Sequence, residues 1–233
     1  DVEVERYRAL SRLVADAVEE TLMELSLGVT EQEVAAEVAR RFLRAGVRPI
    51  VLLVGADDRV RRYRHPIPTA TKVKETLMAA AVGERWGLHA CATRMVHFGR
   101  PSPELRRRFA AVRHVFAALC EAATPGEEYR SVLEAAKKAY REAGFPEEWR
   151  EHHQGGLSGY HLPDFRVTLQ EGWRVQPRTV ICWNPTIAGV KTEDTVLVRT
   201  DGPELLSVTE RWPRSPERAF GERNLVLPEI LER

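Results

Sequence analysis

Two stretches of this chain share one pattern of glycines and apolar residues, and this repeat restricts the possible folds more than any other feature. The stretches 28–46 and 126–144 both begin and end with glycine and have the same length. Their apolar positions coincide in the pairs Val34 and Val132, Ala35 and Leu133, Val38 and Ala136, and Phe42 and Tyr140. A unit of about 100 residues is too long for a solenoid, so we expect two related α/β halves around a shared cleft. A chance match between two amphipathic helices is the alternative interpretation.

Helix signals occur at the beginning of each half. Apolar residues recur at intervals of three and four from Val2 to about Leu27, which is the period of an amphipathic helix. Thr30 and Glu33 form a capping-box pattern for a second helix, and a strand is expected at 49–54. Ser102, followed by a proline, predicts the start of another long helix.

The composition excludes several classes of protein. With 233 residues and 43% apolar content, the chain is long enough for one domain with a substantial core. Its 35 basic and 34 acidic residues nearly cancel, so we expect no nucleic-acid partner. Because no run approaches the roughly 18 apolar residues of a membrane span, we predict a cytoplasmic protein without a membrane partner. The three cysteines are odd in number and widely spaced, which favours reduced, buried thiols.

Five short motifs follow one another in an order that is typical of a known family. They are Gly28-Val-Thr-Glu, His65-Pro66, Thr93-Arg94, His153-Gln-Gly-Gly-Leu and the run from Gly189 to Val198. They resemble the GVTE, His-Pro, DxTR, HGxGL and GxRxEDTVLV motifs of the pita-bread family, which includes methionine aminopeptidases, Xaa-Pro peptidases and creatinase. The resemblance covers about residues 3–210, and the closing run is its most specific part.

The resemblance implies a fold and a domain organisation. We expect an α+β pita-bread fold with two pseudo-symmetric α/β halves around a curved antiparallel sheet, as a single catalytic-type domain over residues 1–233. Residues 211–233 form a tail beyond the matched motifs, which we expect to cover the cleft, contact a second subunit or be loosely ordered. The N-terminal domain of two-domain relatives is expected to be absent, and the protein is expected to be a homodimer.

The metal-binding positions of the family differ in this chain. Active members of the family hold two divalent ions with two aspartates, one histidine and two glutamates, because such cations require anionic oxygen ligands. The matching positions here are Ala80, Cys91 and Asn184, which replace three carboxylates, together with the retained His153 and Glu193. The resemblance therefore implies that a two-metal centre does not form, and we expect no cofactor.

A set of polar residues remains at the matching positions. The candidate catalytic residues are His65, His153, His161, Glu193 and Tyr160, and the candidate substrate-binding residues are Asn184, Arg94 and His89. Tyr160 falls where the family has a second histidine, and a shift of one residue would place His161 there instead. Histidine titrates near neutral pH, and a neighbouring carboxylate can orient it, so such a set can transfer protons.

Each of these residues also has a structural interpretation. His65 and His153 are also interpretable as interior histidines with satisfied hydrogen bonds. Tyr160 is also interpretable as an ordinary half-buried aromatic residue. Glu193 is also interpretable as the ion-pair partner of Arg94 or Lys191.

Three functions are compatible with the sequence. The first is a metal-independent hydrolase that resembles creatinase and acts on a small C–N bonded substrate, with His65 as the proton carrier and Glu193 holding a substrate nitrogen. The second is an aminopeptidase or dipeptidase with one zinc ion at Cys91, His153 and Glu193, which are ligand types that suit Zn²⁺. The third is a non-catalytic module that binds a peptide or a protein. The expected partner of an enzyme is a small molecule or a short peptide.

Overall fold

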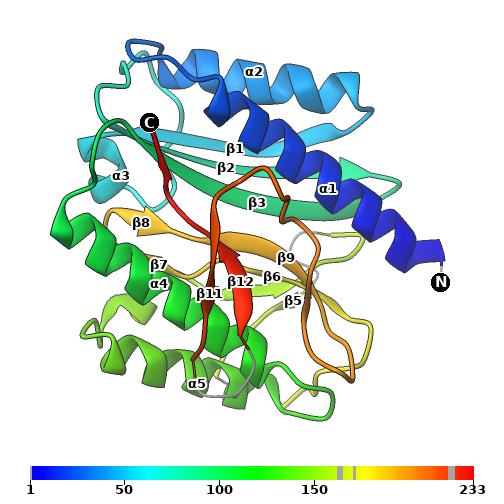
Figure 1. The fold of residues 1–233 in the computed structure, drawn as a ribbon. Coiled ribbons are helices and arrows are strands. Elements are labelled where there is room, and N and C mark those ends of the chain that lie inside the picture. Colours follow the sequence, from blue (N-terminus) through cyan, green and yellow to red (C-terminus); the bar gives the residue numbers. More distant parts are fainter. Residues whose placement is uncertain (1, 162–164, 170–171, 220–223) are drawn as a thin grey trace.

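The protein is an α+β structure in which helices cover one side of a strongly curved sheet (Figure 1). It is described here from a computed structural model, which describes all residues except 1, 162–164, 170–171 and 220–223. The longer elements of the first half are α1 (Val2–Met23), α2 (Glu31–Arg44), β1 (Arg48–Ala56), α3 (Asp58–Arg62), β2 (Thr76–Arg85) and β3 (Leu88–His97). The second half begins with α4 (Pro103–Ala122), α5 (Tyr129–Glu142) and the short helix η1 (Glu148–Arg150).

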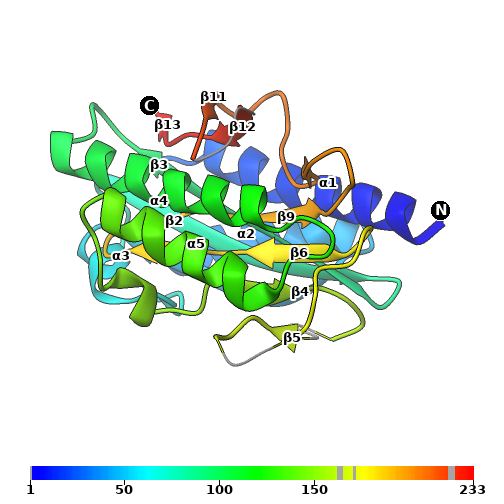
Figure 2. The same cartoon turned by 90° about the horizontal axis from the view of Figure 1, so that it is seen from below.

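The remaining strands of the second half are short. They are β4 (Gly155–Leu157), β5 (Phe165–Arg166), β6 (Val180–Trp183), β7 (Thr186–Ile187), β8 (Val190–Lys191), β9 (Glu193–Leu197) and β10 (Glu204–Leu205). The main sheet runs in the order β1-β2-β3-β9-β6-β4-β5, and each neighbouring pair in this order is antiparallel. The pairing of β3 with β9 joins the strands of the two halves into one sheet (Figure 2).

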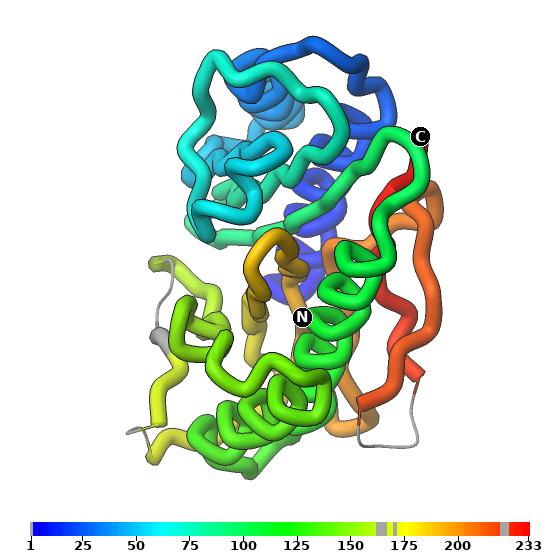
Figure 3. The backbone as a smooth tube through the Cα atoms, turned by 90° about the vertical axis from the view of Figure 1, so that its left-hand side faces the viewer, coloured from blue at the N-terminus to red at the C-terminus, as the bar shows by residue number. Residues whose placement is uncertain are grey.

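The two halves repeat the same pattern of backbone hydrogen bonds at their opening glycines. Gly28 donates to the carbonyl of Val73 at 2.9 Å, and Gly126 donates to the carbonyl of Val175 at 2.9 Å. Isolated bridges join Thr30 to Lys72 and Glu128 to Arg174, two residues after each of those glycines. The helices that follow are α2 and α5, so the repeat read from the sequence is confirmed as two pseudo-symmetric halves (Figure 3).

Local signals in the sequence define the helix ends. The Thr30 side chain accepts a hydrogen bond from the backbone N–H of Glu33, whose carboxylate accepts from the backbone N–H of Thr30. This is the predicted capping box. Ser102 caps α4 with Pro103 in its first turn, as expected. Gly46 and Gly144 follow α2 and α5 with φ angles of 68° and 83°, a conformation that glycine adopts without a steric penalty.

Each half has its own hydrophobic core. One core packs α1 and α2 onto the β2 and β3 strands, around residues such as Leu10, Val18 and Phe42. The other packs α4 against α5 and β6, around residues such as Phe116, Tyr140 and Trp183. Within the described residues, no helix is both long enough and apolar enough to cross a membrane.

The tail packs against the outside of the fold. Strands β11 (Arg214–Glu217) and β12 (Leu225–Pro228) form a hairpin, and β13 (Leu231–Glu232) pairs in parallel with β3. Arg113 of α4 binds the Ser215 carbonyl at 2.9 Å, and Trp212 donates to the carbonyl of Glu229 at 2.8 Å. The tail does not line the cleft described below, so the expectation that it covers the cleft is wrong for its described residues.

Candidate functional site

A pocket of about 190 Å³ lies where the two halves meet. Its walls come from strands β1, β2, β3, β4, β6 and β9 and from the segment that follows α3. Glu193 lines the pocket, whereas the next residue, Asp194, pairs with a buried arginine beneath α1. Successive residues of a strand point to opposite faces, so the pocket and the covering helix α1 lie on opposite faces of the sheet. The lining residues used below are His65, Ala80, Cys91, His153, Cys182, Asn184, Lys191 and Glu193.

Glu193 is buried in this pocket and already has several donors around it. Its carboxylate accepts hydrogen bonds from the Thr93 hydroxyl at 2.6 Å and from the Asn184 amide at 3.3 Å, and it lies 3.1 Å from the Lys191 ammonium. Burial raises the pKa of this carboxyl group, but Lys191 and the hydrogen bonds outweigh burial and hold the pKa below its usual value. Glu193 is therefore ionised and neutralised by Lys191, as one of the structural interpretations of the sequence predicted.

Lys191 and Asn184 offer hydrogen-bonding groups to the pocket. The Lys191 side chain is 3% exposed, and its ion pair in the described part of the chain is with Glu193. An ammonium carries three N–H donors, so this contact leaves donors for a ligand. The Asn184 side-chain oxygen is buried and finds no hydrogen-bond partner among the described residues. A donor and an unsatisfied acceptor therefore flank Glu193 in the same small pocket.

Three histidines gather at the edge of the pocket. The Nε2 atoms of His65 and His152 are 2.9 Å apart, and the rings of His152 and His153 stack with centroids 4.5 Å apart. Burial is the largest cause that lowers the pKa of His152, and together with the charges of Lys191, His153 and His65 it brings this pKa to about 2. His152 is thus neutral at physiological pH. The sequence analysis did not select His152, although its position next to His153 was a signal that was available.

Two thiols line the pocket close to one hydroxyl group. The Thr195 hydroxyl lies 3.7 Å from the Cys91 sulfur and 3.8 Å from the Cys182 sulfur. Burial raises the pKa of the Cys91 thiol well above its usual value, and the neighbouring Cys182 and Glu193 raise this pKa as well. The thiol form of Cys91 is therefore favoured over the thiolate that metal binding and nucleophilic attack require.

The structure separates four of the candidate residues from the pocket. Arg94 is fully buried on the opposite face of the sheet, where it pairs with Glu19 at 2.8 Å, so its predicted substrate-binding role is corrected to a structural one. Tyr160 is 66% exposed and donates to Glu3, and His161 is exposed, so neither lines the pocket. His89 also lies outside the pocket lining and contacts the carbonyl of Gly159 at 3.0 Å. The backbone places these four side chains outside the pocket lining.

The side chains of the pocket do not fit a centre of two divalent metal ions. The side chains present at the expected positions are a methyl group at Ala80, a neutral thiol at Cys91 and an amide at Asn184. The one carboxylate, Glu193, is occupied by an ammonium. One anion cannot offset the charge of two divalent cations, and no bridging ligand is present among these residues.

The predicted zinc set is also corrected. Among the described residues, the group of three ligand-type side chains whose donor atoms all lie within 4.8 Å of one another is His65, His152 and His153. Cys91 and Glu193 do not belong to that group. Of the predicted zinc ligands, only His153 takes part.

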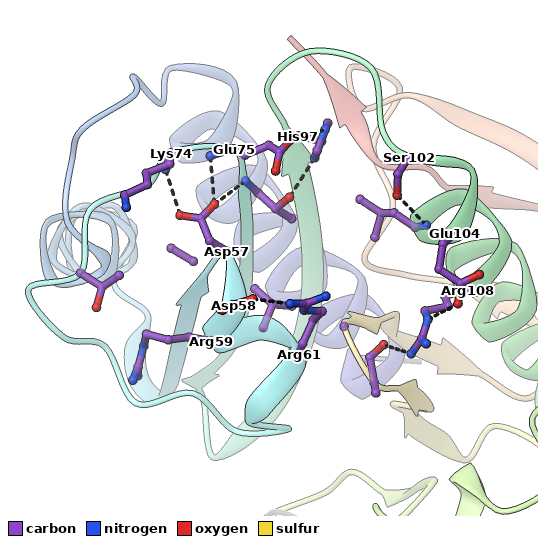
Figure 4. A pocket seen from close by; sticks show the side chains of 17 residues that line it. Asp57, Asp58, Arg59, Arg61, Lys74, Glu75, His97, Ser102, Glu104 and Arg108 are labelled. Carbon is purple, nitrogen blue, oxygen red and sulfur yellow. Dashed lines mark hydrogen bonds and ion pairs between the residues drawn. The ribbon is translucent and has the colours of Figure 1, made fainter.

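A larger hollow of about 610 Å³ opens between α3 and the start of α4 (Figure 4). Many of its charged side chains have partners there. Asp57 accepts hydrogen bonds from the backbone of the segment 74–76, Asp58 pairs with Arg61, and Glu104 pairs with Arg108 at 2.6 Å. Four candidate residues from the sequence line the smaller pocket instead, which we take as the functional site: His65, His153, Asn184 and Glu193.

Comparisons with known proteins agree with this geometry. The structure superposes on a prolidase from Pyrococcus furiosus with a TM-score of 0.83 at 22% identity, over 91% of this chain and 65% of that one. An X-Pro aminopeptidase from Thermotoga maritima gives a TM-score of 0.79 at 21% identity, over 90% and 62%. These similarities confirm the pita-bread fold.

Sequence comparison leads to the same family. An uncharacterized peptidase from Staphylococcus aureus (strain MW2) is 25% identical over 224 residues, and one from Staphylococcus haemolyticus is 26% identical over 219 residues. These matches cover 90% and 88% of this chain but only 62% and 61% of those relatives, so the chain spans about three fifths of their length. The model of one family matches residues 5–200. The chain therefore belongs to metallopeptidase family M24.

Proposed function

We propose that this protein hydrolyses a C–N bond in a small substrate, and that it does so in the 190 Å³ pocket without a metal ion. One observation carries the proposal. The same pocket holds a buried hydrogen-bond donor, the ammonium of Lys191, and a buried acceptor without a partner among the described residues, the side-chain oxygen of Asn184. Membership in a peptidase family supports the reaction class. Creatinase-like chemistry, in which histidine carries the proton, is the form of hydrolysis that suits these side chains.

The polar groups of the pocket match both ends of an amide, ureido or guanidino group. The ammonium of Lys191 can donate to a carbonyl oxygen, or to a carboxylate next to the scissile bond, while the side-chain oxygen of Asn184 can accept from an N–H group. Glu193 holds the Lys191 side chain in place, since the two form an ion pair. This revises the role that the sequence suggested for Glu193, which was to hold a substrate nitrogen.

His65 is the proton carrier in this proposal. Its side chain lines the pocket, and its Nε2 atom faces the neutral His152. His65 accepts a proton from water as the water oxygen attacks the carbon, and a C–O bond forms. His65 then returns the proton to the nitrogen as the C–N bond breaks. An amine leaves, together with a carboxylic acid from an amide, carbamic acid from a ureido group or urea from a guanidino group. General acid–base catalysis of this kind contributes about 10²- to 10⁴-fold to the rate.

The size of the pocket restricts the substrate. Pockets for drug-sized ligands measure roughly 300–1,000 Å³, whereas this pocket measures about 190 Å³. A single amino acid derivative, a ureido acid or a guanidino acid is of the right class. Xaa-Pro dipeptides are at the upper limit, and longer peptides are expected to be poor substrates.

The test is a substrate screen with protein from which metals have been stripped by a chelator. The panel contains small amides, ureido acids, guanidino acids and Xaa-Pro dipeptides, and release of amine or ammonia is measured in the continued presence of chelator. We expect turnover of a small member, and a loss of at least about 100-fold in kcat for His65→Ala with the fold intact. His161→Ala is the control, because His161 is exposed and outside the pocket lining.

Two results would contradict the proposal. Turnover that disappears with chelator and returns with added metal would replace it with a metal-dependent hydrolase. No turnover of any panel member, together with saturable binding of a peptide that His65→Ala does not weaken, would favour the non-catalytic binding module.

A further inference from the structure

We propose that His65, His152 and His153 form a binding site for one divalent transition metal ion of the zinc class. The donor atoms of the three side chains all lie within 4.8 Å of one another. Neutral imidazole is a ligand that suits Zn²⁺, Cu²⁺ and Ni²⁺, and three histidines with one open position are a known ligand set for zinc. Only His153 occupies a position at which the family places a metal ligand, so this donor set differs from the two-metal centre.

The distances in the cluster are close to those of a bound ion. Zinc–nitrogen bonds of about 2.0–2.1 Å and a tetrahedral angle put two ligand nitrogens about 3.3 Å apart. The Nε2 atoms of His65 and His152 are 2.9 Å apart. This distance needs to increase by only a few tenths of an ångström for both nitrogens to bind one ion. The His153 ring stacks on that of His152, and a turn of this ring about its side-chain bonds would bring in the third nitrogen.

The surroundings allow an ion to enter and to be held. His65 is exposed, which provides a path from solvent, whereas His152 is 8% exposed and closes the inner side. Two positive groups close to the cluster, one that acts on His152 and one next to His65 in the sequence, have their own counter-ions. Lys191 pairs with Glu193, and Arg64 pairs with Glu148. The divalent ion would therefore not face an uncompensated cation.

The cluster joins the two halves of the molecule. His65 follows α3 in the first half, whereas His152 and His153 precede β4 in the second half. A bound ion would link segments that are 87 residues apart in the sequence. Because the ion binds the folded state and not the unfolded chain, it should raise the melting temperature.

One consequence rests on the proposed function. The ion and a proton compete for the same nitrogen of His65, so a protein with bound metal has no proton acceptor at that position. We therefore expect zinc to inhibit hydrolysis reversibly, with one equivalent sufficient for inhibition.

The experiment titrates the chelator-stripped, desalted protein with ZnCl₂ by calorimetry and with CoCl₂ by visible absorption. We expect one equivalent of either metal, a cobalt spectrum typical of four-coordinate nitrogen ligation, and a higher melting temperature with zinc. His152→Ala should weaken binding at least about tenfold and abolish the cobalt spectrum. His161→Ala, which removes an exposed histidine outside the cluster, should leave binding unchanged.

The outcomes distinguish the metal site from the proposed function. The site is overturned if neither metal binds to the wild-type protein, or if binding is as tight in a folded His152→Ala variant as in the wild type. Activity is then measured with increasing zinc. Inhibition supports both proposals, whereas activation by the bound ion keeps the site and overturns metal-independent hydrolysis. Unchanged turnover with the ion bound keeps the site and overturns the role of His65 as proton carrier.

Discussion

Glu193 and Asp194 are neighbours in the sequence, yet their carboxyl groups have opposite surroundings. Glu193 faces the pocket and is held ionised by Lys191. Asp194 points to the other face of the sheet, where it accepts from Ser207 at 2.7 Å and from Arg94 at 3.0 Å. Burial raises the pKa of Asp194 to about 6, because the loss of hydration outweighs the attraction of Arg94. A sequence motif that contains both acids cannot show which one titrates near neutral pH.

Asp194 gives a prediction about stability and pH. A carboxyl group with a pKa of about 6 in the fold and about 3.8 in the unfolded chain stabilises the fold below about pH 4. That contribution is lost as the pH rises through about 6. The two pKa values differ by about 2, and each unit corresponds to about 1.4 kcal/mol, so the expected loss is roughly 3 kcal/mol.

The measurement compares the wild type with Asp194→Asn, which keeps the size of the side chain and cannot ionise. The free energy of unfolding is determined by urea denaturation at about pH 4.5 and pH 7.5. Between these two values, the wild type should lose roughly 2 kcal/mol more than the variant, because part of the contribution is already lost at pH 4.5. Parallel changes in the two proteins would show that Asp194 has an ordinary pKa.

At the scale of the elements, the repeat allows two equivalent helix starts to be compared. The α2 helix begins with the capping box of Thr30 and Glu33. The α5 helix begins at the matching position with Glu128, whose side chain makes no capping hydrogen bond. Both residues form an isolated antiparallel bridge to a later segment, Thr30 with Lys72 and Glu128 with Arg174, so the surrounding backbone is alike.

Thr30→Ala should therefore lower the free energy of unfolding by about 1 kcal/mol, because it removes an acceptor for the first-turn N–H groups. Glu128→Ala is the matched substitution in the other half, and it should lower the free energy of unfolding much less than Thr30→Ala does, since it removes only exposed ion pairs. Both values are measured by chemical denaturation. Equal losses would mean that the capping box adds nothing to the stability of α2.

At the scale of the whole molecule, Arg94 connects elements that are far apart in the sequence. It lies on β3 and contacts Glu19 of α1, Asp194 of β9 and the carbonyl of Ser207, and its side chain is fully buried. Strands β3 and β9 form the seam between the halves, so the arginine stabilises the seam from the face opposite the pocket.

Removal of this arginine should destabilise the whole fold. Arg94→Ala leaves two buried acids without their partner, and losses of about 3–5 kcal/mol are usual in that situation. Thermal and urea unfolding measure the effect. A variant that keeps its stability but binds substrate more weakly would restore the substrate-binding role that the sequence suggested. Glu20→Ala on the exposed side of α1 is the control, with a smaller expected effect.

Local patterns in the sequence determined much of this protein. The spacing of apolar residues and the capping residues predicted α2 and α4, because a helix start depends on neighbours within one turn. The repeated glycines predicted the two halves. The ordered motifs predicted the family fold and the position of the cleft, including His65, His153, Asn184 and Glu193, which all line the pocket.

Only the tertiary structure decided how those residues combine. It paired Lys191 with Glu193, brought His152 to His65 from the other half, and carried Arg94 and Tyr160 away from the pocket. The physical reason is that each of these contacts depends on the face of a strand that a side chain occupies and on how two halves meet. Residue spacing shows which face of a strand a side chain occupies only when the register of the strand is known. It does not show how the two halves meet.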